Sequence, residues 1–213
     1  MTMKTDDLIR ALANDGKSLW RVGNLLTVAL LAAVPVSVVL FFVEMGVRPD
    51  IATAIQNPFF DLKFAVTISL ALSAVALSLH LSRPEATLRG VILILAIPVG
   101  LLVAGIVAEL MLPQRVSWIS RLVGSNSRIC LTAIPVLSMP FLAAALVALR
   151  HGAPSRPALA GAFAGLLSAG LAATLYASHC TDDSPLFVAT WYTLAVALVT
   201  AIGAFAGSRV LRF

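Results

Sequence analysis

Six apolar blocks, each close to the length of a bilayer-crossing helix, constrain this chain more than any other feature. A helix needs about 20 apolar residues to cross a bilayer. Only 12% of the residues are charged and 60% are hydrophobic, whereas a soluble domain carries about a quarter charged residues. The sequence therefore predicts an all-α integral membrane protein, a bundle of six transmembrane helices with short loops. The blocks cover roughly residues 22–46, 64–81, 91–112, 129–149, 158–178 and 186–207.

The blocks divide the chain into three parts. Residues 1–21 form a polar tail with a short amphipathic helix, residues 22–208 form the six-helix transmembrane domain, and residues 209–213 form a short end. The first block is too long for the apolar region of a secretory signal and follows the polar tail, so no signal peptide is expected. The loops leave no room for a second folded domain.

The basic residues predict the orientation of the chain. With a cytoplasmic N-terminus, ten Lys and Arg residues fall in inner segments and five in outer segments. The positive-inside rule therefore places both termini in the cytoplasm. The isoelectric point near 9.9 comes from residues that flank the apolar blocks, so we expect no direct contact with nucleic acid.

The N-terminal tail carries a candidate docking helix. Thr5 is a suitable N-cap, and Leu8, Ile9 and Leu12 share one helical face. One interpretation is a helix that lies on the membrane surface before the first span. The other is a helix whose residues Leu8, Ile9, Arg10 and Leu12 contact a groove on a cytoplasmic partner.

The sequence does not indicate an enzyme. It has neither a nucleophile beside a base nor paired carboxylates at a shared depth, the usual equipment of catalysis. The span centres have almost no ionisable groups, which also counts against an ion or proton relay. His80 and His151 could meet near the inner face as haem ligands, but interfacial histidines are the preferred interpretation, and we expect no cofactor.

The chain has two cysteines, which the predicted topology places on its outer side. Cys130 begins the fourth span and Cys180 follows the fifth, and these spans form a hairpin. Counted from the hairpin loop, the two lie about 23 and about 27 residues away, so they differ in height by about one turn. A disulfide needs Cα atoms about 4.4 to 6.8 Å apart, and the sequence leaves their mutual orientation open. Two unrelated buried thiols are the alternative.

Cys180 also stands in a polar cluster, because His179, Asp182 and Asp183 surround it. These side chains could ligate a metal together with Cys130 and Cys180, or tune the thiol. The spacing is not that of a zinc motif, so it assigns no particular metal.

Two identical pentapeptides, Gly161–Gly165 and Gly203–Gly207, place glycines four residues apart on the fifth and sixth spans. Small residues at this spacing let helix backbones approach closely. Packing within the bundle is the preferred interpretation, and a homodimer is the alternative.

Three runs in the C-terminal half are distinctive: Cys130-Leu-Thr-Ala-Ile-Pro135, Leu149-Arg-His-Gly-Ala-Pro154 and the block from Tyr176 to Tyr192. In these runs the chain resembles the NrsF-type family of bacterial membrane anti-sigma factors. The opening run from Met3 to Arg10 also looks like the start of that family, so the resemblance covers essentially the whole chain.

The resemblance implies a six-span protein of the bacterial inner membrane that sequesters an extracytoplasmic-function sigma factor on the cytoplasmic side. It further implies release under oxidant or heavy-metal stress, with Cys130 and Cys180 as the sensor. A small metal-ion transporter or carrier that uses the same thiols is the competing hypothesis.

Overall fold

The computed structural model describes residues 22–81, 90–113, 117–152 and 154–211. The candidate docking residues Leu8, Ile9, Arg10 and Leu12 lie outside this range, so their role stays a prediction.

Six long helical segments account for the fold, and no strand occurs among the described residues. All six are long and apolar enough to cross a membrane. The prediction of an all-α bundle with six spans is confirmed. The segments are α2 (Val22–Glu44), α4 (Pro58–Leu81), η1 (Val91–Leu95) continued by α5 (Ala96–Met111), α7 (Ser127–Arg150), α8 (Pro157–Ala177), and α9 (Pro185–Phe187) continued by η2 (Val188–Tyr192) and α10 (Thr193–Val210).

The second span begins earlier than its apolar block predicted, at Pro58 instead of residue 64. Proline suits the first helical position, and the Asn57 side chain accepts a hydrogen bond from the Phe59 amide at 3.0 Å. The first two turns contain Asp61 and Lys63, which lower the local hydropathy. A hydropathy pattern therefore misses a helix start that capping determines.

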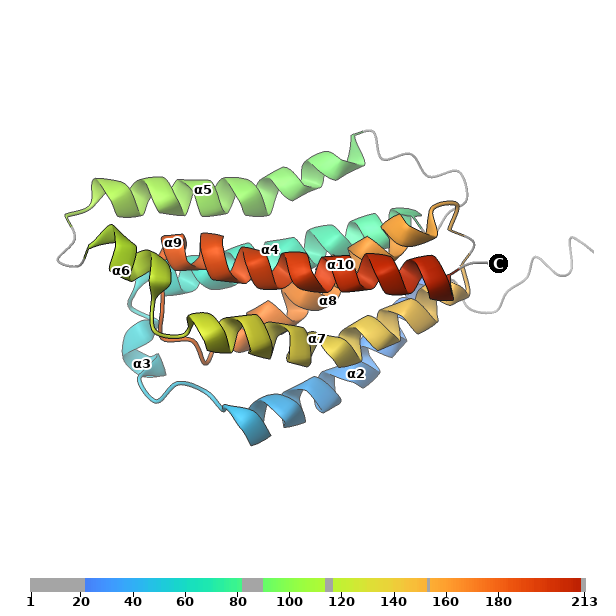
Figure 1. Ribbon diagram of the computed structural model, residues 1–213, viewed down its shortest axis with the longest axis horizontal. Helices are drawn as coiled ribbons and strands as arrows, with labels where there is room; N and C mark the ends of the chain where they lie inside the picture. Colours follow the sequence, from blue (N-terminus) through green and yellow to red (C-terminus); the bar gives the residue numbers. More distant parts are fainter. Residues whose placement is uncertain (1–21, 82–89, 114–116, 153, 212–213) are drawn as a thin grey trace, which may run out of the picture.

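Two short helices complete the described fold, α3 (Ile51–Ala54) and α6 (Trp118–Val123). They follow the first and third spans and lie at one end of the bundle (Figure 1). The α7 helix bends near its middle in Figure 1, where Pro135 and Pro140 interrupt its backbone hydrogen bonds.

The α8 helix is the centre of the bundle and α5 lies at its margin. In its most apolar stretch α8 is 61% buried, against 17% for the third span, which contains α5. The α8 helix packs against α4, α7 and α10, whereas α5 packs mainly against α4. Figure 1 shows α5 set apart from the other long helices along much of its length.

The repeated glycines lie where α8 and α10 touch. A Cβ added at Gly161 would overlap the carbonyl oxygen of Gly203, and one added at Gly207 would lie 2.6 Å from the Cα of Gly161. The two backbones are therefore too close for any side chain at these positions. Packing within the bundle is confirmed as the role of the pentapeptides, and the homodimer alternative stays a prediction.

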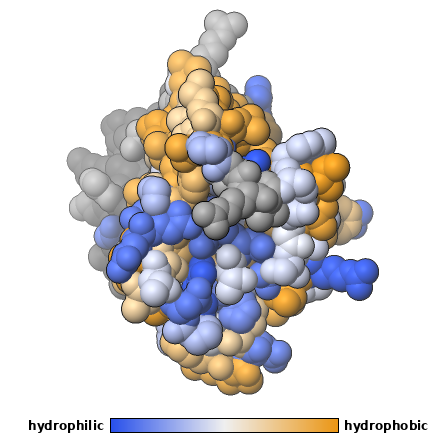
Figure 2. Space-filling view, turned by 90° about the vertical axis from the view of Figure 1, so that its left-hand side faces the viewer, coloured by the Kyte–Doolittle hydropathy of each residue, from blue (hydrophilic) through white to orange (hydrophobic). Residues whose placement is uncertain are grey.

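The loops that the sequence assigned to the outer side lie together at one end of the molecule. The α2–α3 connection, α6 and the α8–α9 loop share this end, and the end of α10 lies at the other (Figure 1). Figure 2 views the loop end directly and shows hydrophilic side chains gathered across its centre, with hydrophobic residues around them. Cys180, in the α8–α9 loop, and Cys130, near the start of α7, both belong to this end.

Candidate functional site

The two cysteines lie in one buried cluster near the loop end of the bundle. Cys130 is on the first turn of α7, and Cys180 is three residues beyond α8; neither side chain is exposed. They belong to the same core cluster of buried side chains. The expectation that the α7–α8 hairpin places them at similar height is confirmed, and both are free thiols.

Aromatic rings belong to the same buried cluster as the thiols. Tyr176 and Tyr192 lie in the same cluster, with ring centroids 5.7 Å apart, and Phe187 meets Tyr192 edge to face at 6.3 Å. The hydroxyl of Tyr192 approaches Cys180. Tyr192 ends the π-helical turn η2, and such turns occur frequently at functional sites.

The loop from Ser178 to Ser184, here called the thiol loop, holds Cys180 in place. The Cys180 amide donates to the Tyr176 carbonyl at 3.1 Å, and its Sγ contacts the Asp182 carbonyl oxygen at 3.7 Å. Burial raises the pKa of the Cys180 thiol, and the nearby Lys63 ammonium opposes that rise. The thiol is therefore shielded and protonated at neutral pH.

Two cations bind the centre of the thiol loop. Lys63, fully buried on α4, donates to the Asp183 carboxylate at 2.7 Å and to the Cys180 carbonyl at 2.8 Å. Arg48 donates to both oxygens of Asp183 at 3.0 Å. Arg48 also pairs with Asp50 at 2.7 Å, and this bond raises the pKa of the guanidinium and lowers that of the carboxyl. These contacts, here called the cation clamp, satisfy charges that burial would otherwise make costly.

Asp182 joins the thiol loop to the start of α7. Its carboxylate accepts hydrogen bonds from the backbone amides of Ser125 and Asn126, the latter at 2.8 Å. The Asn126 side-chain amide donates to the same carboxylate at 2.9 Å. A carboxylate in this position neutralises unpaired amides and the positive end of the helix dipole. The loop that carries Cys180 thus caps the helix that carries Cys130.

The two ends of the thiol loop have partners of their own. His179 shares a hydrogen bond with the Gly46 carbonyl at 2.9 Å, and the Ser184 hydroxyl donates to Glu109 of α5 at 2.7 Å. Glu109 is 2% exposed and pairs with Arg121 of α6 at 2.8 Å. The thiol loop is therefore bound to α4, α5, α7 and the α2–α3 connection.

The residues suggested for metal binding have separate partners. His179 bonds a carbonyl, Asp182 caps α7 and Asp183 accepts from the cation clamp. Within the described part of the chain, no group of three or more His, Cys, Asp or Glu side chains could hold a metal ion. A site made by Cys130 and Cys180 alone stays a prediction, as does tuning of the thiols by His179, Asp182 or Asp183.

Comparison with known proteins decides the family. A family model described as a negative regulator of sigma F matches residues 12–213. The chain belongs to the NrsF family. It is 38% identical over 214 residues to the anti-sigma-F factor NrsF of Caulobacter vibrioides, a match that covers 99% of this chain and all of the relative. It is 31% identical over 213 residues to a probable anti-sigma-F factor NrsF of Azospira oryzae, with the same coverage. No solved structure matches the chain.

Membership of the NrsF family confirms the resemblance drawn from the sequence. It gives this chain a regulatory role as an anti-sigma factor, whose partner is a sigma factor. Six of its helices are long and apolar enough to cross a membrane.

The sequence interpretation missed the cations of this NrsF-family site. Arg48, Lys63 and Arg121 belong to the five basic residues of the predicted outer segments, and each pairs with an acid. The sequence offers a signal for these pairs, because Asp183 and Glu109 also fall near the predicted outer ends of the spans. Their individual pairing depends on the rotation of each helix.

Proposed function

We propose that this chain is an anti-sigma factor of the bacterial inner membrane that sequesters an extracytoplasmic-function sigma factor and releases it when its cysteines are oxidised or capture a heavy metal. Both termini lie in the cytoplasm in this proposal, and the thiol loop faces outward. The observation that carries it is the burial of both cysteines of the chain in one cluster.

The thiol loop offers a route from the cysteines to the helices. A bond between Cys130 and Cys180 changes the contacts between α7 and the loop after α8. These helices are joined at their opposite ends, near Arg150 and Pro157, so a change in their packing reaches the side predicted to face the cytoplasm. A tenfold loss of sigma affinity requires only about 1.4 kcal/mol between two bundle states. A disulfide or a metal site supplies that much.

The sigma factor contacts the cytoplasmic surface in this proposal, with Leu8, Ile9, Arg10 and Leu12 of the tail as the docking residues. Substitution of Leu8→Asp or Leu12→Asp should release the sigma factor without stress. Unchanged co-purification of the sigma factor would move the contact to the inner loops.

The decisive experiment replaces both thiols. Membranes that contain the Cys130→Ser, Cys180→Ser double variant should retain the sigma factor and should not release it with peroxide, chromate or cadmium. Thr132→Ser is the matched control, since Thr132 lies on the same helix with an exposed side chain. Release from the double variant at the wild-type rate would refute the sensor assignment. Metal flux in proteoliposomes, with no sigma factor retained, would favour the transporter hypothesis.

A further inference from the structure

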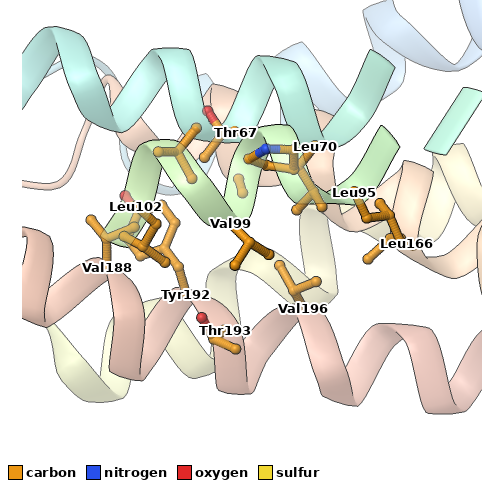
Figure 3. A pocket seen from close by; sticks show the side chains of 13 residues that line it. Thr67, Leu70, Leu95, Val99, Leu102, Leu166, Val188, Tyr192, Thr193 and Val196 are labelled. Carbon is orange, nitrogen blue, oxygen red and sulfur yellow. The ribbon is translucent and has the colours of Figure 1, made fainter. Parts of the chain in front are cut away.

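An apolar cavity of about 270 Å³ lies between α4, α5, α8 and the last span. Its lining includes Leu70, Val99, Leu166 and Val196, which project into it in Figure 3. The hydroxyl of Thr67, another lining residue, already bonds carbonyl oxygens of its own helix. An apolar space of this kind excludes water and accepts hydrocarbon.

One side of this cavity is formed by the buried cluster that contains both cysteines, here called the thiol cluster. Ala173, Val188 and Tyr192 line the cavity and belong to the cluster that contains both cysteines. Tyr192 borders both the cavity and the thiols, because its side chain lines the cavity (Figure 3) and its hydroxyl approaches Cys180. Val188 and Tyr192 are the two ends of the π-helical turn η2. A π turn has a less regular hydrogen-bond ladder than an α-helix.

The surroundings of the cavity indicate what occupies it. The apolar surface that η1 and α5 expose includes Val99, a lining residue that is 60% exposed, besides Leu93, Ile97 and Val103. In a bundle of six bilayer-length helices such a face contacts acyl chains. Neither cysteine has any exposed surface, so a reagent reaches the thiols only through the surrounding protein.

We propose that this cavity admits the oxidised acyl chain of a membrane lipid, a fatty acyl hydroperoxide, and delivers it to the cysteine pair. This rests on the proposed function and names the oxidant that acts at the same thiols. The Cys180 sulfur attacks the terminal peroxide oxygen and the O–O bond breaks. The lipid leaves as an alcohol with the thiol proton, and Cys180 becomes a sulfenic acid. The Cys130 thiol then displaces water from it and forms the disulfide.

The test uses the full chain in lipid vesicles and measures loss of both thiols by mass spectrometry. Each variant is exposed to phosphatidylcholine hydroperoxide in the bilayer and, separately, to hydrogen peroxide at the same peroxide concentration. The ratio of the two rates is compared between variants, which removes the effect of lipid partitioning. Val196→Trp should lower this ratio by roughly tenfold or more, because it fills the space for the ligand.

Three variants keep the result interpretable. Leu198 lies on the same helix, is 48% exposed and does not line the cavity. The Leu198→Trp variant should therefore give the same ratio as the wild type. Val196→Ala enlarges the cavity and should keep or raise the ratio. Val136→Trp fills a second cavity that borders the thiol cluster, between α2 and α7, and should leave the ratio unchanged.

The proposal would be overturned if Val196→Trp and Leu198→Trp gave equal ratios of the two oxidation rates. It would also be overturned if Val136→Trp alone lowered this ratio. If both peroxides oxidise the cysteine pair and no cavity variant changes the ratio, the cavity proposal fails while the redox part of the proposed function stands. Failure of both peroxides to oxidise the pair would refute the cavity proposal and the redox part of the proposed function together.

Discussion

The Nζ atom of Lys63 donates a hydrogen bond to the carbonyl oxygen of Cys180 across 2.8 Å. This bond joins α4 to the thiol loop, 117 residues away in the sequence. The same ammonium pairs with Asp183 at 2.7 Å. A cation in the first turns of α4 therefore fixes the position of the Cys180 thiol, which follows α8.

Removal of this ammonium should destabilise the bundle. Lys63→Met leaves the Cys180 carbonyl with only the longer Arg48 contact and removes one of the two cations on Asp183. We expect a loss of about 3 kcal/mol in the free energy of unfolding, typical of a broken buried ion pair. Arg128→Met, at an exposed position on the same end of the bundle, should change it by less than about 0.5 kcal/mol. Detergent-titration unfolding measures both, and equal losses would contradict the cation clamp.

The carboxylate of Asp182 should stabilise the start of α7. Asp182→Ala removes the acceptor for the Ser125 and Asn126 amides and should cost about 1 to 2 kcal/mol, as for other lost helix caps. Amide hydrogen exchange should rise in the first turn of α7, around Cys130. The exposed Asp61 makes a suitable comparison, and Asp61→Ala should leave that exchange unchanged. No rise in Asp182→Ala would mean that the cap does not hold this turn.

The crossing of α8 and α10 should tolerate no side chain. Gly161→Ala places a Cβ against the Gly203 carbonyl and the Gly207 Cα, and we expect a loss of about 1 to 3 kcal/mol from the forced separation. Gly100→Ala on α5 has no atom within 4 Å of the new Cβ and should be neutral or stabilising by up to about 1 kcal/mol. Thermal unfolding in detergent distinguishes them. Equal behaviour would show that the glycine contact is dispensable.

The Cys180 thiol should react slowly at neutral pH. Burial raises its pKa above the usual value of 9.0, so the reactive thiolate becomes scarcer in the folded protein. In the Cys130→Ser variant, labelling by N-ethylmaleimide should lag behind that of the detergent-unfolded protein from pH 7 to 9. The rate should keep rising above pH 9, where the unfolded thiol levels off. A folded thiol that levels off at or below pH 9 would contradict the shielding.

The same shift has a consequence for stability. The folded state holds the Cys180 proton more tightly than the unfolded chain, so this contribution to stability is complete below the unfolded pKa. It declines as the pH rises toward the folded pKa. Unfolding measured on both sides of pH 9 should therefore show a loss of stability on the alkaline side that Cys180→Ser reduces.

Much of the site followed from local features of the chain. The α7–α8 hairpin brings Cys130 and Cys180 to similar height because each lies a similar number of residues from the same short loop. The glycine pentapeptides predicted close packing because their spacing places small residues on one helical face. Neither inference needed knowledge of how the helices are rotated.

Hydropathy determined that this chain forms six bilayer-length helices, because the preference of an apolar segment for lipid is a property of that segment alone. Only the tertiary structure decided that Lys63 holds Asp183, that Asp182 caps α7, and that Tyr192 borders both the thiol cluster and an apolar cavity. These relationships depend on the rotation of each helix and on the path of the thiol loop. Packing among all the spans determines both, and no single segment encodes them.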